Sequence, residues 1–254
     1  MGRLTGRTAI VTGGAKGIGR HYAQALAAEG AEVMIADIVD GSDVAEEIAR
    51  KHGRNATTSM TFDVSDEAQV KSLVAATLER FGKIDVLVNN AALFAPLVHR
   101  KATEIDVETW DKVMAVNVRG PFLMVKHVAP HMIARRYGKI INIGSGTVYK
   151  GLPGLLHYTT SKGAIATFTR TLSRELGEHG ICVNTLSPGF TLSDSVIETG
   201  THSAEQQTRS MASRAMRREE TPEDLVGTVV FLASPDSDFI TGQTIAVDGG
   251  SVNT

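Results

Sequence analysis

Tyr158 and Lys162, four residues apart, are the pair of side chains in this sequence best suited to proton transfer. On a helix this spacing places both on one face. A free phenol with a pKa of about 10 is a poor base at neutral pH, but a neighbouring ammonium favours the phenolate and lowers that pKa. Ser145 precedes Tyr158 by 13 residues and could donate a hydrogen bond to the same substrate oxygen. Such a set suits reduction of a carbonyl or oxidation of an alcohol, in which a proton moves at oxygen and a hydride at carbon.

A glycine-rich segment, residues 12–19, lies between a short apolar run and a helical segment. Glycine permits positive φ and lets the backbone approach a pyrophosphate, which the N-terminus of the following helix then holds. The spacing of Gly13, Gly17 and Gly19 differs from the usual G-x-G-x-x-G, and taken alone the segment could be a simple tight turn. Its position between a strand and a helix favours a dinucleotide-binding loop.

Asp37 ends the next apolar run, 18 residues after Gly19. A carboxylate there can accept both ribose hydroxyls of NAD and would repel the 2′-phosphate of NADP. Its alternative role is to cap a turn or a helix. Lys16 could pair with that phosphate, but Ile38 offers no second cation, and desolvating Asp37 against a dianionic phosphate should cost more than one lysine returns. We therefore expect NAD as the cofactor.

Short apolar runs alternate with longer amphipathic segments along the whole chain. The expected strands are 8–11, 32–36, 58–62, 84–88, 139–143, 182–186 and 244–247, and the expected helices are 17–29, 44–52, 67–81, 107–133, 157–178 and 222–233. Nearly continuous apolar strands separated by helices indicate a parallel sheet covered on both faces. We expect an α/β fold: one doubly wound, Rossmann-like domain, 1–254, with a mostly parallel seven-stranded sheet.

The least regular stretch, 190–218, is rich in Ser, Thr, Arg and Met and follows the sixth expected strand. Ligands of open α/β sheets bind beyond the C-terminal ends of the strands. The stretch is therefore expected to be a substrate lid, with a surface loop of no catalytic consequence as the alternative.

Taken together, six motifs in order resemble the short-chain dehydrogenase/reductase family over practically the whole chain. They are residues 12–19, Asn89-Asn90-Ala91, Asn117, Ser145, Tyr158 with Lys162, and Pro188-Gly189. The resemblance implies Tyr158 as the catalytic acid/base and Lys162 as the modulator of its pKa and a ligand of the nicotinamide ribose. It implies Ser145 as a donor to the substrate oxygen and Asn117 as the anchor of a water relay behind Lys162. By its own chemistry, Asn117 could equally be a satisfied core amide.

The resemblance also implies the surroundings of the cofactor, with Asp63 and Val64 flanking the adenine, although Asp63 could be a plain N-cap. The full expected set is Gly13, Lys16, Gly17, Ile18, Gly19, Asp37, Ile38, Asp63, Val64, Asn90, Ala91, Tyr158, Lys162, Pro188, Gly189 and Thr191. Two positions depart from the family pattern. Ala92 stands where the family usually has glycine, and Ser193 stands where threonine is common.

The expected substrate pocket is mostly apolar or aromatic. Its expected members are Leu93, Phe94, Thr147, Val148, Tyr149, Leu152, Leu155, His157, Met211 and Met216. None of them forms an arginine cluster suited to a phosphate or a dicarboxylate. We expect a small, moderately hydrophobic secondary alcohol, ketone or aldehyde, and the sequence is similar to aryl-alkyl alcohol dehydrogenases.

Two other functions stay open. A 3-oxoacyl-carrier-protein reductase using NADPH would need a basic docking patch, for which Arg135, Arg136 and Lys139 are the only tight cluster. A non-catalytic dinucleotide sensor would need only the glycine loop and Asp37.

Composition narrows the partners. The net charge of −2 gives no large positive field, so nucleic acid is not expected. The eight histidines show no paired ligand spacing, so no metal is expected. The single cysteine, Cys182, is expected to be a buried thiol in a reducing compartment. Residues 1–7 lack an apolar signal core and no apolar run reaches spanning length, which favours the cytoplasm and no membrane. The C-terminal segment 239–250 resembles the family's last strand and, by that analogy, implies a homotetramer.

Overall fold

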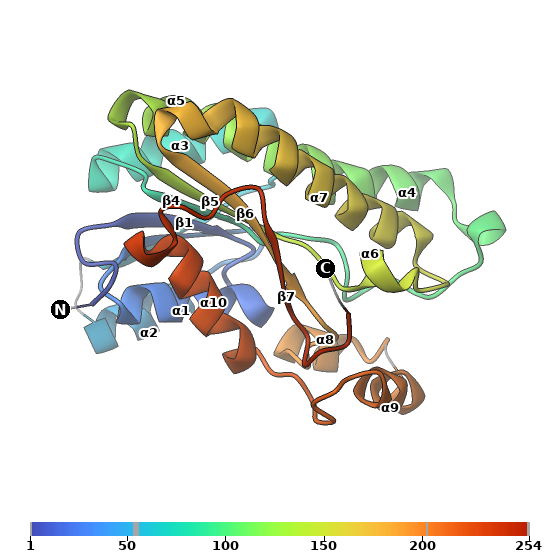
Figure 1. Ribbon diagram of the computed structural model, residues 1–254. Helices are drawn as coiled ribbons and strands as arrows, with labels where there is room; N and C mark the ends of the chain where they lie inside the picture. Colours follow the sequence, from blue (N-terminus) through green and yellow to red (C-terminus); the bar gives the residue numbers. More distant parts are fainter. Residues whose placement is uncertain (1, 53–55, 202, 253–254) are drawn as a thin grey trace.

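The computed structural model describes residues 2–52, 56–201 and 203–252, which form one sheet with helices on both faces (Figure 1). The strand order is β3-β2-β1-β4-β5-β6-β7, and every pairing is parallel. The strands are β1 (Thr8–Thr12), β2 (Glu32–Asp37), β3 (Thr57–Thr61), β4 (Val86–Asn89), β5 (Gly138–Ile143), β6 (Ile181–Pro188) and β7 (Thr244–Val247). The expected Rossmann-like α/β fold with seven strands is confirmed, and the sheet is parallel throughout.

Two layers of helices cover the sheet because successive side chains of a strand point to opposite faces. One layer contains α1 (Gly17–Ala28), α2 (Ser42–His52) and α10 (Glu223–Ala233), and the other contains α3 (Glu67–Phe81), α5 (Gly120–Arg135) and α7 (Leu156–Leu176) (Figure 1). Val11 and Ile35 are buried with the first layer, whereas their neighbours Ile10 and Met34 are buried with the second. Both faces therefore need apolar residues, which explains the continuous apolar runs.

The remaining helices are short and lie in the connections. They are α4 (Val107–Met114), α6 (Thr147–Lys150), α8 (Asp194–Thr199) and α9 (Ala204–Ala212), with 3₁₀ turns at Ala102–Glu104, Gly177–His179 and Pro235–Ser237. Among the residues that the structure describes, no helix is both long and apolar enough to cross a lipid bilayer.

The expected helical segment over 107–133 is helical throughout, but a π-helical turn, Ala115–Arg119, lies between α4 and α5. Pro121 has no N–H and cannot donate an α-helical hydrogen bond to the carbonyl of Asn117. The N–H of Gly120 instead reaches back five residues to the carbonyl of Ala115. The π turn places Asn117 at the point where the helix changes its winding, and such turns are frequent at functional sites.

The expected lid segment, 190–218, is less irregular than its composition suggests, because it contains α8 and α9. Residue 202 lies outside the described residues. Ser203 accepts a hydrogen bond from the N–H of Gln206, whose side chain in turn accepts from the N–H of Ser203. This Ser-x-x-Gln capping box is a sequence signal for the start of a helix, and the amino-acid composition of the segment does not reveal it.

A fully buried carboxylate, Asp85, lies just before β4 and contacts the first residue of β1. Its Oδ2 accepts a hydrogen bond from the N–H of Thr8 at 2.9 Å. Its charge is balanced by Arg135 at 3.0 Å and by Lys83 at 3.3 Å. Removing a buried partner leaves donors and cations uncompensated. We expect Asp85→Ala to lower the free energy of unfolding by about 3–5 kcal/mol, measured by urea denaturation.

A matched surface carboxylate gives the control. Glu205, whose side chain is 83% exposed, pairs with Arg209 at 3.5 Å. Exposed pairs contribute about 1 kcal/mol or less, so Glu205→Ala should leave the unfolding free energy within that range. If Asp85→Ala were no more destabilising than Glu205→Ala, the account of Asp85 as a buried anchor would be wrong.

Candidate active site

The ends of the strands surround a cavity of about 790 Å³. Because all strands are parallel, the residues that follow β1, β2, β4, β5 and β6 meet at one edge of the sheet. The order changes direction between β1 and β4, and ligands of such sheets bind at that switch point. Every expected cofactor and catalytic residue lines this cavity except Gly19 and Asn117.

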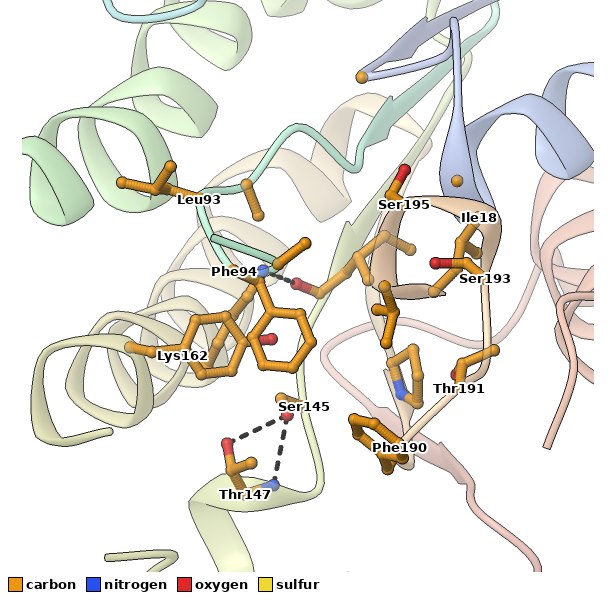
Figure 2. A pocket seen from close by; sticks show the side chains of 18 of the residues that line it. Ile18, Leu93, Phe94, Ser145, Thr147, Lys162, Phe190, Thr191, Ser193 and Ser195 are labelled. Carbon is orange, nitrogen blue, oxygen red and sulfur yellow. Dashed lines mark hydrogen bonds between the residues drawn. The ribbon is translucent and has the colours of Figure 1, made fainter. Parts of the chain in front are cut away.

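Ser145, Tyr158 and Lys162 lie together and are all buried. Tyr158 and Lys162 are on consecutive turns of α7, and Ser145 follows β5. The Ser145 Oγ accepts hydrogen bonds from the N–H of Thr147 at 3.3 Å and from its hydroxyl at 3.0 Å (Figure 2). Because these two donors use the lone pairs of Ser145, its own proton is left to be donated elsewhere. One acceptor is Tyr158, whose ionised form this hydrogen bond favours.

Burial controls the proton affinities of this group. It raises the pKa of Tyr158 to about 12, and the hydrogen bond from Ser145 opposes that rise. Burial also lowers the pKa of Lys162 to about 8. The Lys162 Nζ donates to the carbonyl of Ile143 at 2.8 Å and lies 5.8 Å from the centre of the Tyr158 ring. Desolvation of the phenolate therefore has the largest influence on the pKa of Tyr158 in the protein alone, and the lowering of this pKa by Lys162 stays a prediction.

Asn117 connects the loop after β4 to α7 from outside the cavity. Its Oδ1 accepts from the N–H of Leu93 at 2.7 Å, and its Nδ2 donates to the Ser161 hydroxyl at 3.0 Å. Both ends of the amide are satisfied, as the core-amide alternative predicts. Ser161 precedes Lys162, so Asn117 supports the part of α7 that carries the buried ammonium.

The glycine loop has the shape that a dinucleotide requires. Gly13 and Gly17 have φ values of +64° and +60°, which other residues rarely adopt. A Cβ on Gly19 would lie 2.0 Å from the carbonyl oxygen of Gly13. Asn90 donates from its Nδ2 to the carbonyls of Thr12 at 3.0 Å and Gly13 at 2.9 Å. Gly19 thus acts by close packing and Asn90 by holding the loop, which explains why Gly19 does not line the cavity.

The residues expected at the ribose and the adenine, Asp37, Asp63 and Val64, also line the cavity. Asp37 is 7% exposed, and its Oδ2 accepts from the N–H of Ala15 at 3.0 Å. Each carboxylate oxygen keeps a further lone pair for a hydroxyl donor. Asp63 accepts from the N–H and the hydroxyl of Ser65, whereas the N-cap of α3 is Asp66. The loop, the carboxylate and the size of the cavity together fit a nicotinamide dinucleotide.

A residue that the sequence did not single out occupies the start of α1. Asp194, the first residue of α8, accepts a hydrogen bond from the N–H of Gly17 at 2.8 Å. This N–H is at the helix N-terminus, where a pyrophosphate is expected to bind. Figure 2 shows the segment with Thr191, Ser193 and Ser195 on the same side of the pocket as Ile18, across from Ser145 and Lys162.

The substrate side of the cavity differs in part from the expected one. Leu93, Phe94, Thr147, Leu152 and Leu155 line it as expected, whereas Val148, Tyr149, His157, Met211 and Met216 do not. His157 is buried and accepts from the N–H of Tyr158 at 3.0 Å, so it is packed at the helix start. Met216 is 59% exposed beyond α9.

Polar side chains replace the expected methionines at the outer wall. The polar and basic lining residues missed from the sequence include His99, Lys112, Lys150, Gln206, Arg209, Ser210 and Ser213. Gln206, Arg209 and Ser213 lie three and four positions apart, so one face of α9 turns its polar side to the cavity. Met211, two residues after Arg209, does not line the cavity. Within the described residues, no group of three or more His, Cys, Asp or Glu side chains could hold a metal ion.

Comparison with known proteins agrees with this geometry. The family model described as enoyl-(acyl carrier protein) reductase matches residues 13–252. Galactitol 2-dehydrogenase of Agrobacterium fabrum (strain C58) is 40% identical, and the match covers 98% of each chain. Sorbitol dehydrogenase of Cereibacter sphaeroides is 39% identical, again over 98% of each chain. The crystal structure of levodione reductase has a TM-score of 0.91 at 27% identity and covers 97% of both chains.

These matches extend over almost the whole chain, and most of the residues of the six sequence motifs line the cavity. The chain belongs to the short-chain dehydrogenase/reductase family, whose members are oxidoreductases that use nicotinamide dinucleotide cofactors.

Proposed function

We propose that this protein is an NAD-dependent dehydrogenase that moves a hydride between NAD(H) and a small secondary alcohol and its ketone, or an aldehyde. The observation that carries the proposal is one cavity lined both by the glycine loop with Asp37 and by Ser145, Tyr158 and Lys162. Two of the relatives, galactitol 2-dehydrogenase and sorbitol dehydrogenase, are named for the oxidation of alcohols, which supports this chemistry.

Three side chains, Ser145, Tyr158 and Lys162, would carry out the proton transfer in both directions of the reaction. When bound, the dinucleotide supplies or accepts the hydride at its nicotinamide ring. In reduction, the Ser145 hydroxyl holds the substrate oxygen, and the Tyr158 hydroxyl gives its proton to that oxygen. In oxidation, Tyr158 takes the proton back. Lys162 would stabilise the resulting phenolate and would also hold the ribose of a bound dinucleotide.

The cavity also supports a proposal about the substrate. The rings of Phe94 and Tyr158 are in tilted contact with their centres 4.7 Å apart, and Leu155 is buried beside them, so the reacting end of the substrate would meet an apolar wall. Lys150 and the polar face of α9 lie on the same cavity. We therefore propose a substrate whose carbinol end is apolar and whose far end carries hydroxyls or another polar group.

A spectrophotometric screen tests the reaction. Purified protein with NAD⁺ is offered secondary alcohols of both kinds, aryl-alkyl alcohols and linear polyols, and NADH formation is followed at about 340 nm. Oxidation of members of either class would support the proposal. Failure of every alcohol, together with failure of the corresponding ketones and NADH, would contradict it.

The alternatives make different predictions. A carrier-protein reductase needs an exposed basic patch, but Lys139 is 1% exposed and pairs with Asp238 at 2.7 Å, beside the buried Cys182. Arg135 is paired with Asp85. The third member, Arg136, is exposed but donates to the carbonyl of Glu178 at 2.9 Å, and this arrangement of the cluster disfavours the alternative. A sensor has no need of the buried Tyr158 and Lys162.

The proposal includes the lid at 190–218 and its contact with the cofactor loop. Asp194 and a pyrophosphate cannot both accept from the N–H of Gly17, so the start of α8 must move away when the cofactor binds. Asp194→Asn keeps the shape and removes the competing charge. Because an anion at a helix N-terminus is worth about 0.3–1 kcal/mol, we expect NADH to bind roughly two- to fivefold more tightly, measured by calorimetry.

Glu205→Gln is the matched control, because it removes one charge from the same segment at an exposed position. It should leave the NADH dissociation constant unchanged. Equal or weaker NADH binding by Asp194→Asn would contradict the lid contact.

A homotetramer is also proposed, by analogy with the family. The last strand, β7, is only partly buried, and Phe239 next to it is fully exposed, so a second copy would find an apolar surface there. Light scattering of the purified protein should give four times the mass of one chain, and a monomer would contradict this part of the proposal.

A further inference from the structure

A buried ion pair outside the expected site, Arg214 with Glu220, lies directly behind the turn that follows β6. Arg214 is 5% exposed and Glu220 is 4% exposed. Their Nη2 and Oε2 atoms are 3.2 Å apart. Burying two charges is costly unless hydrogen bonds satisfy both. The partners of this pair therefore indicate what it is for.

All of those partners but one lie on the same turn, and the exception is the carbonyl of Arg218, which accepts from the Arg214 Nη1 at 2.7 Å. The Glu220 Oε1 accepts from the N–H of Gly189 at 3.1 Å and from the hydroxyl of Thr191 at 2.7 Å. Arg214 donates to the carbonyl of Phe190 at 2.7 Å. Three consecutive residues are thus each held by one member of the pair, and the carbonyl of Glu220 also accepts from the N–H of Leu192 at 2.9 Å.

The packing is too close for any other residue at the first of these positions. A Cβ on Gly189 would lie 2.4 Å from the Glu220 Oε2 and 3.2 Å from the Arg214 Nη2. The glycine of the Pro188-Gly189 motif is therefore needed here because the ion pair lies against its backbone. Any side chain at this position would displace the carboxylate.

The front of the same turn faces the reacting end of the cavity. Gly189, Phe190 and Thr191 line it together with Tyr158 and Lys162. Figure 2 shows Phe190 and Thr191 on the wall across from Ser145 and Lys162. The back of the turn thus contacts the ion pair and its front contacts the ligand.

The hydrogen bond from Thr191 to Glu220 has a direct consequence. A hydroxyl has one proton and two lone pairs. Because Thr191 gives its proton to Glu220, only its acceptor side can be offered to a bound ligand. A carboxamide presents an NH₂ group that needs such an acceptor.

From this arrangement, and resting on the proposed function, we infer that Arg214 and Glu220 are positioning residues for the nicotinamide half of the cofactor. They fix the backbone of Gly189–Thr191 and turn the Thr191 oxygen so that it accepts from the carboxamide. Neither residue touches the adenosine half, which the glycine loop and Asp37 would hold at the other end of the cavity.

The test compares two ligands that differ only in that half: NADH, and ADP-ribose, which lacks nicotinamide. The main variant is the double substitution Arg214→Met with Glu220→Met, which removes both charges together and leaves none unpaired. We expect its NADH dissociation constant, measured by calorimetry, to rise about tenfold or more, which corresponds to the loss of one or two hydrogen bonds. Its ADP-ribose dissociation constant should stay within about twofold of wild type.

Retained ADP-ribose binding also shows that the variant is folded. A second variant, Glu220→Gln, keeps the side-chain shape and one acceptor oxygen, and we expect an intermediate loss of NADH affinity with ADP-ribose unchanged. Arg218→Met is the matched control, because Arg218 belongs to the same segment but pairs with Asp224 at the surface. It should change neither constant.

Three results would overturn the inference. An equal loss of affinity for NADH and ADP-ribose would mean that the ion pair only stabilises the fold. No change in either affinity would mean that the turn does not need the ion pair to hold its conformation. Wild-type protein that binds neither ligand would remove the proposed function itself, and this outcome is visible before any variant is made.

Discussion

Tyr158→Phe is expected to lower kcat by about 10²–10⁴-fold while the dissociation constant of NADH stays within about threefold of wild type. The substitution removes one oxygen from a side chain that is 6% exposed and leaves the ring against Phe94. Ser145 can still hold the substrate oxygen, but no group remains to exchange a proton with it. Steady-state rates with the best alcohol from the screen, together with an NADH titration, measure both quantities.

The pairing of the two measurements separates an enzyme from a dinucleotide sensor. Tyr149→Phe is the control, because Tyr149 on α6 is partly exposed and does not line the cavity. It should leave kcat unchanged. If Tyr158→Phe turned over substrate as fast as Tyr149→Phe, Tyr158 would not be the acid/base, and the assignment of the reaction to Ser145, Tyr158 and Lys162 would fail.

Exchanging the charge at the end of β2 is expected to reverse the choice of cofactor. Asp37→Asn keeps an oxygen that can accept from the N–H of Ala15 but removes the charge that repels a 2′-phosphate. Ile38→Arg, at a position that is 67% exposed, adds the second cation that the phosphate lacks. For the double variant we expect the ratio of NADPH to NADH affinity to rise about 10²-fold or more. One charge-assisted contact is lost with NADH and another is gained with NADPH, and each contributes about 1.5–3 kcal/mol.

The two single variants separate the contributions of the two substitutions to the cofactor selectivity. Asp37→Asn alone should mainly weaken the binding of NADH. Ile38→Arg alone should have little effect on the binding of NADPH, because Asp37 still repels the 2′-phosphate. A double variant with the selectivity of wild type would show that Asp37 only caps the glycine loop. That outcome would remove the main argument for NAD.

The fold could be predicted from sequence because its strands are buried on both faces. Runs such as Ile10–Val11 and Met34–Ile35 must be apolar throughout, and this signal is local. The expected strands accordingly differ from the observed ones by only a few residues. Most of the expected cofactor residues line the cavity, because they follow strand ends at fixed points of the topology.

Contacts between distant segments could not be predicted in this way. Asp194 and Gly17 are 177 positions apart, and nothing near either residue in the sequence indicates that they meet. The partners of Glu220 likewise become visible only when the turn after β6 is folded over it. On the short helices α6 and α9 the direction of each side chain depends on tertiary packing. We therefore expected Met211 to line the cavity, whereas Gln206 and Arg209 line it in the structure.

The most direct test of the central claim is a titration of the wild-type protein with NADH and, in parallel, with NADPH. Quenching of the single tryptophan, Trp110 on α4, and the fluorescence of the bound nicotinamide report binding independently of any substrate. We expect saturable binding of NADH that is markedly tighter than that of NADPH. Tighter NADPH binding would contradict the role of Asp37, and binding of neither cofactor would contradict the assignment of the cavity itself.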